Sequence, residues 1–150
     1  MNPAVIIPTF YTSATRKRNT PSALYDHPTP LNSKGTLERC LASLEKVKGL
    51  GQIIVLVATE DNVDKEAAAK VKEIVDKFPQ MHILIIAKEE ENIIQQRFEQ
   101  LGFGNQSDCI GLTGYSAVRN LGLVVAQVLG FDSVVFLDDD EVIEDEEFLE

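Results

Sequence analysis

Short runs of apolar, mostly β-branched residues alternate along the chain with longer segments of helical periodicity. The runs cover residues 4–7, 53–57, 83–87 and 134–137. Each run is almost continuously apolar, which is typical of strands that are covered on both faces of a sheet. The pattern therefore predicts buried, mostly parallel strands.

The segments between these runs carry apolar residues at helical spacing. Thr36 is expected to cap the first helix and Asp64 the second. Two further helices are predicted over residues 90–101 and 115–129. The expected inward positions of the last helix are Val118, Leu121, Val125 and Val128. Strands that alternate with helices imply right-handed crossovers, so we predict an α/β fold of three layers, α/β/α, around a mostly parallel sheet.

Two stretches have no helical or strand pattern, and they cover residues 8–34 and 102–114. In open parallel sheets, the loops that follow the carboxyl ends of the strands build the ligand site. The first stretch directly follows the first predicted strand, so it is either a functional loop or a disordered one.

Composition and charge narrow the classes of function. The 150 residues suit one domain, and the net charge of −10 argues against a nucleic-acid-binding protein. We find neither a signal peptide nor an apolar run near the ~20 residues that would span a bilayer, so no transmembrane segment is expected. Cys40 and Cys109 are expected to be buried thiols, which together with the missing leader favours a cytoplasmic location. A small basic cluster, residues 16–18, contrasts with the acidic end of the chain.

The strongest chemical signal is the sequence Asp138, Asp139, Asp140, directly after the last apolar run. Alternation along an extended backbone places Asp138 and Asp140 on one side and Asp139 on the other. Converging carboxylates repel each other unless they bind a hard cation such as Mg²⁺ or Mn²⁺, which could then hold a diphosphate. The alternative is a solvated acidic tail, with residues 141–150 beginning a helix whose acidic face meets solvent.

Three segments in this order resemble the family 2-like glycosyltransferases of the GT-A, nucleotide-diphospho-sugar transferase fold. Residues 5–9 (VIIPT) are similar to the opening strand of that family and its nucleotide loop. Residues 114–122 (GYSAVRNLG) resemble its G-x-x-x-A-R-N-x-G helix, with the alanine displaced by one position. Residues 136–140 (FLDDD), with the later residues 148–150, resemble its D-x-D strand and the helix that follows.

The resemblance implies a donor site for a nucleoside diphosphate sugar. Asp138 and Asp140 would correspond to the metal-binding D-x-D positions, with Asp140 favoured as the direct metal ligand. Its neighbours Asp138 and Asp139 would lie near the ribose and diphosphate and bind the nucleotide sugar. The implied activity is that of a hexosyltransferase-type glycosyltransferase, which transfers the sugar to an acceptor hydroxyl. The nucleotide, the sugar, the acceptor and the oligomeric state stay open.

The resemblance also implies positions for the nucleoside. Pro8 and Thr9 would lie beside the base and ribose. Arg119 would face the diphosphate, or would be a surface arginine paired with an acidic neighbour. The family usually reads V-D-D-G-S after its second strand, whereas this chain reads VATEDN over residues 57–62. Glu60 or Asp61 would then meet the base, or would cap a helix.

Two further differences from the family concern the first loop and the end of the chain. The loop after the first strand is longer than the usual P-T-Y-N-R turn, and Arg16 or Arg18 could replace its arginine. In the family, the general base and the acceptor site follow the D-x-D strand. We therefore expect residues 1–150 to be a single nucleotide-sugar-binding domain, truncated after that strand, with the general base beyond Glu150.

Other classes of protein share parts of the acidic pattern. Residues 138–142 fit the D-x-D-x-[TV] motif of haloacid-dehalogenase-type phosphatases, in which Asp138 would be the nucleophile and Asp140 the acid/base. That motif normally opens its domain, whereas here it closes the chain. Nucleotidyltransferases are disfavoured because no G-x-G-T-R loop follows the first strand. A non-catalytic module that binds nucleotide or metal is the remaining alternative.

Overall fold

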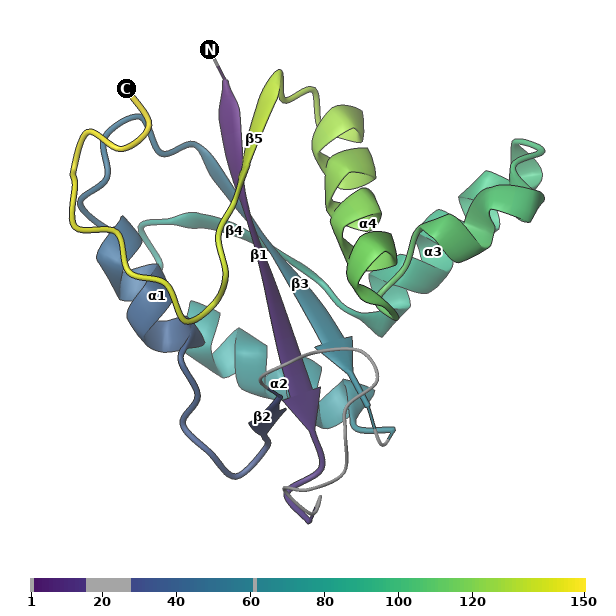
Figure 1. The fold of residues 1–150 in the computed structure, drawn as a ribbon, viewed down its shortest axis with the longest axis horizontal. Coiled ribbons are helices and arrows are strands. Elements are labelled where there is room, and N and C mark those ends of the chain that lie inside the picture. The colour runs from purple at the N-terminus through teal and green to yellow at the C-terminus, as the bar shows by residue number, and fades with distance from the viewer. Residues whose placement is uncertain (1, 16–27, 61) are drawn as a thin grey trace.

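A parallel sheet lies between two layers of helices in the computed structural model, which describes residues 2–15, 28–60 and 62–150 (Figure 1). The strands are β1 (Pro3–Thr12), β2 (Thr29–Pro30), β3 (Gln52–Thr59), β4 (His82–Ile86) and β5 (Ser133–Phe136). The helices are α1 (Leu37–Leu44), α2 (Asp64–Val75), α3 (Lys88–Gln100), the short 3₁₀ helix η1 (Gly104–Cys109) and α4 (Tyr115–Val128). The predicted α/β class with a mostly parallel sheet is confirmed.

The order of the strands shows where the winding of the chain reverses. The sheet has the order β2-β1-β3-β4, and β5 also pairs with β1, so β2 and β5 share one edge of β1. Apart from the two-residue β2, the order across the sheet is β4-β3-β1-β5. The chain first winds outward from β1 through β3 to β4, and then returns to the other edge of β1. In open α/β sheets such a reversal is the usual place for a ligand.

Strand β1 is longer than predicted, because it continues through Pro8 to Thr12. The carbonyl groups of Ile6 and Thr12 accept hydrogen bonds from Leu137 and Leu31 on the edge of β1 that faces β5 and β2. Alternation of the backbone places Pro8 on this same edge, between the two partner strands. A proline, which has no N–H group to donate, is tolerated where no partner strand needs one. The irregular stretch predicted from residue 8 therefore begins after the strand.

The strands supply two separate hydrophobic cores, one on each face of the sheet. The core under α1 and α2 includes Val5, Ile7, Ile53, Val55, Leu41, Leu44 and Val71. The core under α4 includes Ala4, Ile6, Ile54, Leu56, Val118, Leu121 and Val125. Successive residues of β1 and β3 thus face opposite cores, which explains why these strands read as continuous apolar runs.

Helix α4 packs directly on the sheet through Gly122. A Cβ atom at this position would lie 3.0 Å from Ile6 and 3.1 Å from Leu56. The buried face of α4 is therefore centred on Gly122 and Ala126, which turns Val128 toward the flank and leaves it 79% exposed. The prediction that Val128 belongs to the core was wrong.

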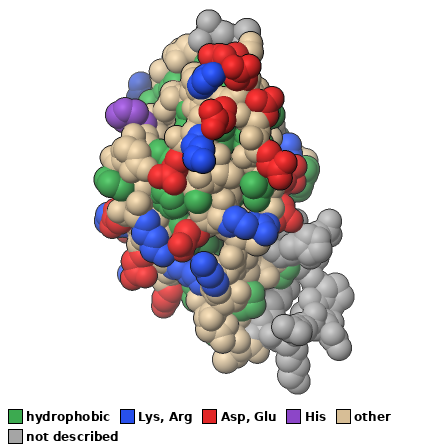
Figure 2. Space-filling view, turned by 90° about the vertical axis from the view of Figure 1, so that its left-hand side faces the viewer, with side chains coloured by type: hydrophobic (Ala, Val, Ile, Leu, Met, Phe, Trp, Pro, Cys, Tyr) green, Lys and Arg blue, Asp and Glu red, His purple; other side chains and the backbone are tan. Residues whose placement is uncertain are grey.

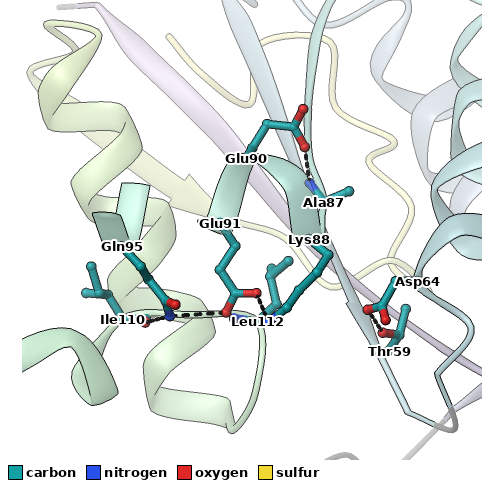
Figure 3. Close-up of polar contacts among 9 residues, drawn as sticks. All are labelled: Thr59, Asp64, Ala87, Lys88, Glu90, Glu91, Gln95, Ile110 and Leu112. Carbon is teal, nitrogen blue, oxygen red and sulfur yellow. Dashed lines mark hydrogen bonds and ion pairs between the residues drawn. The ribbon is translucent and has the colours of Figure 1, made fainter. Parts of the chain in front are cut away.

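Thr36 is the N-cap residue of α1, as predicted, whereas Val63 and not Asp64 is the N-cap residue of α2. The hydroxyl of Thr36 makes no capping bond to α1. Asp64 is the first residue of α2, and its carboxylate accepts a 2.5 Å hydrogen bond from the hydroxyl of Thr59 (Figure 3). In both cases the expected capping side chain is hydrogen-bonded to another side chain and not to the helix backbone: Thr36 to Asp139, and Asp64 to Thr59.

The end of the chain follows α1 and does not begin a helix, so that prediction was also wrong. Figure 1 shows the segment after β5 turning back beside α1. Within residues 141–150, the N–H of Ile143 donates to the Ser43 hydroxyl at 3.0 Å. Ile143 and Leu149 pack against the core under α1. Contacts with this core hold the segment in irregular structure and a turn, and not in a helix.

The cysteines and the surface charges complete the description. Cys40 is buried as expected, whereas Cys109 is exposed at the end of η1, contrary to the prediction. On the side of the molecule that carries α1 and the C-terminal segment, acidic and basic side chains are interspersed (Figure 2). Among the described residues, no helix is both long enough and apolar enough to cross a membrane.

Candidate functional site

The site lies where β1 and β5 separate at their carboxyl ends. Leu137 still donates its N–H to Ile6 of β1 at 3.0 Å, and the chain then turns away through Asp138, Asp139 and Asp140. The sheet thus delivers all three carboxylates to the point at which its winding reverses. We call residues 138–141 the acidic turn. Its α1 side and its α4 side face opposite layers of helices.

Asp139 fastens the α1 side of the acidic turn. One carboxylate oxygen accepts a 2.5 Å hydrogen bond from the Thr9 hydroxyl of β1, and the other accepts a 3.3 Å bond from the Thr36 hydroxyl before α1. Burial raises the pKa of Asp139, while the two hydroxyl donors oppose that rise. The carboxylate expected to lie near the ribose and diphosphate thus has both oxygens bound inside the protein.

Asp138 lies on the α4 side and is open to solvent. Its side chain is 63% exposed, and Oδ1 lies 3.6 Å from Nη2 of Arg119. Asp138 and Asp139 therefore face opposite sides, as strand alternation predicts. The backbone of Asp138 donates to Oε2 of Glu141 at 2.8 Å and accepts the N–H of Glu141 at 3.0 Å. These bonds hold the turn without using the Asp138 carboxylate.

Arg119 is held by aromatic rings more than by its acidic neighbour. Its guanidinium lies 4.6 Å from the ring centroid of Tyr115 and 5.0 Å from that of Phe136. The 3.6 Å contact with Asp138 is longer than a normal N–H···O bond of about 2.7–3.2 Å. Its Nε atom is buried and has no hydrogen-bond partner within the described part of the chain. The cation is thus fixed in place with unused donor capacity.

The other residues of the 114–122 segment shape the backbone around Arg119. Gly114 has φ of +91°, a conformation that favours glycine, immediately before α4 begins. The side-chain amide of Asn120 donates to the carbonyl of Cys109 at 2.9 Å. Gly122 allows the close contact with the sheet described above. The polar and glycine positions of this segment therefore have separate structural roles around one arginine.

The remaining predicted residues lie at the same edge of the sheet or outside the description. Pro8 lies in β1 next to Thr9. Glu60 follows β3, and its N–H donates to the Tyr11 carbonyl at 3.1 Å. Because β3 lies on the opposite edge of β1 from β5, Glu60 is separated from the acidic turn by one strand. Asp61 and residues 16–18 lie outside the described residues.

Sequence reasoning missed three residues of α1 and its approach that contact the acidic turn. Besides Thr36, Arg39 donates from Nη2 to the Asp140 carbonyl at 2.9 Å, and the Cys40 thiol lies 3.7 Å from the Asp138 carbonyl. Burial and then the nearby aspartates raise the pKa of Cys40 to about 12, so the thiol stays protonated. A helix that follows a parallel strand starts at the carboxyl edge of the sheet, and this rule could have suggested them.

Two aspartates of the acidic turn are the residues that could bind a divalent cation. Asp138 and Asp140 are both exposed, whereas Asp139 is turned toward its threonine partners. In the part of the chain that the structure describes, no group of three His, Cys, Asp or Glu side chains is placed to hold a metal ion. Mg²⁺ is commonly bound through one or two carboxylates, with water and substrate phosphates completing its shell. Two exposed carboxylates could therefore bind such a cation only together with a ligand that completes its shell.

The acidic turn, Arg119 and the ends of β1 and α1 meet at the reversal point of a parallel sheet. Models of known protein families, curated proteins and solved structures were compared with the chain, and none of them matches it.

Proposed function

We propose that this chain is the donor-binding part of a hexosyltransferase-type glycosyltransferase with a GT-A fold. It binds a nucleoside diphosphate sugar through Mg²⁺ or Mn²⁺ held by Asp138 and Asp140. The observation that carries the proposal is that the exposed Asp138 carboxylate meets a stacked and incompletely bonded Arg119 at the reversal point of the sheet.

The charges of the acidic turn explain why a cation is needed. Bare carboxylates repel a diphosphate, whereas a divalent cation between them neutralises part of both charges. Arg119 adds a fixed positive group on the α4 side, and a guanidinium binds phosphate oxygens through charge-assisted hydrogen bonds. Metal and arginine together suit a ligand with two adjacent phosphate groups.

The nucleoside is proposed to lie along the end of β1. Pro8 and Thr9 would flank the base and ribose there, and Glu60 is a candidate contact for the base. Because the Thr9 hydroxyl already donates to Asp139, Thr9 would contact the ligand through its backbone or methyl group. The free thiol of buried Cys40 is compatible with the cytoplasmic location that we propose. The ligand of this site would be a nucleotide sugar and not a nucleic acid.

Calorimetric titration tests the donor site directly. UDP, GDP, ADP, CMP and dTDP are titrated with Mn²⁺, with Mg²⁺, and with EDTA in place of metal. We expect one nucleotide to bind only with metal. Asp140→Ala should weaken this binding at least about tenfold, the loss expected for a carboxylate whose charge-assisted bonds contribute about 1.5–3 kcal/mol. Circular dichroism should show that the variant stays folded.

A matched control separates a specific site from general acidity. Glu144→Ala removes one exposed negative charge from the same segment, outside the acidic turn, and should leave affinity unchanged. Equal losses in the two variants, or no metal-dependent binding in the folded protein, would contradict the proposed site. Transfer is tested separately by donor hydrolysis with metal, and binding without turnover would favour the non-catalytic module.

A further inference from the structure

A buried carboxylate lies outside the acidic turn, on α3. Glu91 is only 2% exposed, although glutamate is seldom fully buried unless it is paired. Its carboxylate accepts the N–H of Leu112 at 2.8 Å and contacts Nζ of Lys88 at 2.6 Å (Figure 3). Burying a charge costs free energy even when it is paired, so this position calls for a structural or functional reason.

The loop before α4 is shaped around Glu91. Gln95, one turn further along α3, donates from Nε2 to the carbonyl of Ile110 at 3.2 Å. A Cβ atom on Gly111 would lie 2.6 Å from Oε1 of Glu91 and 3.3 Å from Nε2 of Gln95. Figure 3 shows the two side chains of α3 reaching this loop. The backbone of residues 110–112 is therefore bound to the side chains of Glu91 and Gln95 on α3.

The same loop is bound to α4 on either side of Arg119. The N–H of Gly111 donates to the carbonyl of Ala117 at 3.2 Å. The amide of Asn120 donates to the carbonyl of Cys109 at 2.9 Å. These two bonds reach the turn of α4 that carries Arg119. A continuous set of contacts thus joins Glu91 to the place where Arg119 meets Tyr115 and Phe136.

We propose that Glu91 is a positioning residue for Arg119. By holding residues 110–112 against α3, it sets the first turns of α4 and so places the Arg119 guanidinium beside the acidic turn. The part that concerns nucleotide rests on the proposed function, whereas the placement of Arg119 stands on contacts within the protein. Lys88 completes the set as the cation that offsets the buried charge of Glu91.

Nuclear magnetic resonance tests the placement without any ligand. The Arg119 guanidinium lies 4.6 Å and 5.0 Å from the ring centroids of Tyr115 and Phe136, so ring currents should displace its Nε ¹H–¹⁵N signal from those of exposed arginines. The signal should be missing in Arg119→Lys. Glu91→Leu removes the acceptor for Leu112 and should move the signal toward the exposed position. Glu91→Gln keeps a carbonyl oxygen for Leu112, so it should retain the displaced signal.

Two further variants keep this test decisive. Glu90→Ala removes the neighbouring carboxylate of α3, which accepts the N–H of Ala87 at 3.0 Å, and should leave the Arg119 signal in place. Gly111→Ala should move the signal even with Glu91 intact, and it serves if Glu91→Leu does not fold. An unmoved Arg119 signal in a variant whose Leu112 amide signal has shifted would overturn the proposal.

A double-mutant cycle asks whether Glu91 acts on nucleotide through Arg119. Metal-dependent affinity is measured for Glu91→Leu, Arg119→Ala and the double variant. Because coupled residues have non-additive effects, Glu91→Leu should lower nucleotide affinity about fivefold or more when Arg119 is present and less than about twofold when Arg119 is replaced by alanine. Additive losses would overturn the positioning role. If the unaltered protein binds no nucleotide, the donor-site proposal fails while the Arg119 signal still decides the placement.

Discussion

The two sides of the acidic turn use adjacent aspartates in opposite ways. On the α1 side, Asp139 is half-buried, and Thr9 and Thr36 donate to both of its oxygens. On the α4 side, Asp138 is exposed, and it lies 3.6 Å from Arg119, beyond normal hydrogen-bond distance. The Arg119 guanidinium is held instead by stacking on two aromatic rings. One side is closed by internal bonds, and the other leaves both of its charged groups available.

This difference indicates that Asp139 fixes the backbone of the acidic turn, whereas Asp138 and Asp140 are left free to meet a ligand. A binding site needs groups that are free to meet a ligand on a backbone that is already fixed. Asp139 supplies the fixed backbone, because its bonds join the ends of β1 and β5 to the start of α1. Asp138 and Asp140 can then stay exposed without the turn losing its shape. A substitution on the α1 side or the α4 side should therefore weaken that side and leave the other intact.

The largest effect should come from the cation on the α4 side. Arg119→Ala should lower metal-dependent nucleotide affinity about tenfold to a hundredfold, since hydrogen bonds to charged groups contribute about 1.5–3 kcal/mol. Arg39→Ala is the matched control on the α1 side, where Arg39 donates to the Asp140 backbone. Arg39→Ala should lower nucleotide affinity less than about threefold, because exposed ion pairs contribute little free energy. Calorimetry that shows equal losses would place the phosphates between the two arginines.

The next effect concerns stability and the α1 side. Thr9→Val keeps the side-chain shape but removes the donor to a buried carboxylate. It should lower the free energy of unfolding by about 2 kcal/mol, measured by urea unfolding. Asp138→Asn, on the exposed side, should change the free energy of unfolding by less than about 0.5 kcal/mol. If both variants lost the same stability, the two sides of the turn would not differ in the way described.

A smaller effect is expected from the ring that covers Arg119. Tyr115 is 59% exposed and stacks on the guanidinium. Because an exposed cation–π contact contributes about 0.5–1 kcal/mol, Tyr115→Leu should weaken nucleotide binding about two- to fivefold. Tyr115→Phe keeps the ring and should bind like the unaltered protein. A loss in the phenylalanine variant would instead assign the ligand contact to the tyrosine hydroxyl.

The smallest effect is the pH dependence of Asp139, because burial and hydrogen bonding act on it in opposite directions. Burial raises its pKa in the folded protein, so its contribution to stability is present at low pH and is lost as the pH rises through that pKa. Asp139→Asn, which has no charge to bury, should therefore gain stability relative to the unaltered protein as the pH rises from 4 to 7. Urea unfolding between pH 7 and 4 should show this advantage shrinking on acidification. An advantage that grew instead would contradict the raised pKa.

Much of the fold could be predicted because the sheet is apolar on both faces. The runs at residues 53–57 and 134–137 lie within or next to β3 and β5, and the α/β class follows from their alternation with helices. The extent of β1 could not be predicted in this way. Whether a strand tolerates Pro8 depends on which edge lacks a partner, and strand order is not visible in local sequence.

The candidate site shows the same limit. Three consecutive aspartates after an apolar strand locate the acidic turn, and the 114–122 segment identifies Arg119. Thr36 and Arg39, which bind the acidic turn, lie at the start of α1, about a hundred residues away in sequence. No local pattern therefore links them to the turn. The prediction of a helix within residues 141–150 failed for a related reason, since Ile143 and Leu149 pack against the core under α1.

The sequence by itself determined the layered α/β architecture and the position of the acidic turn, because periodicity and strand-end residues act locally. Only the tertiary structure decided which aspartate is buried and which is exposed. That choice depends on the threonines that β1 and α1 bring to Asp139 and on the rings that hold Arg119 near Asp138. Burial and hydrogen bonding are set by neighbours in space, and here those neighbours come from opposite ends of the chain.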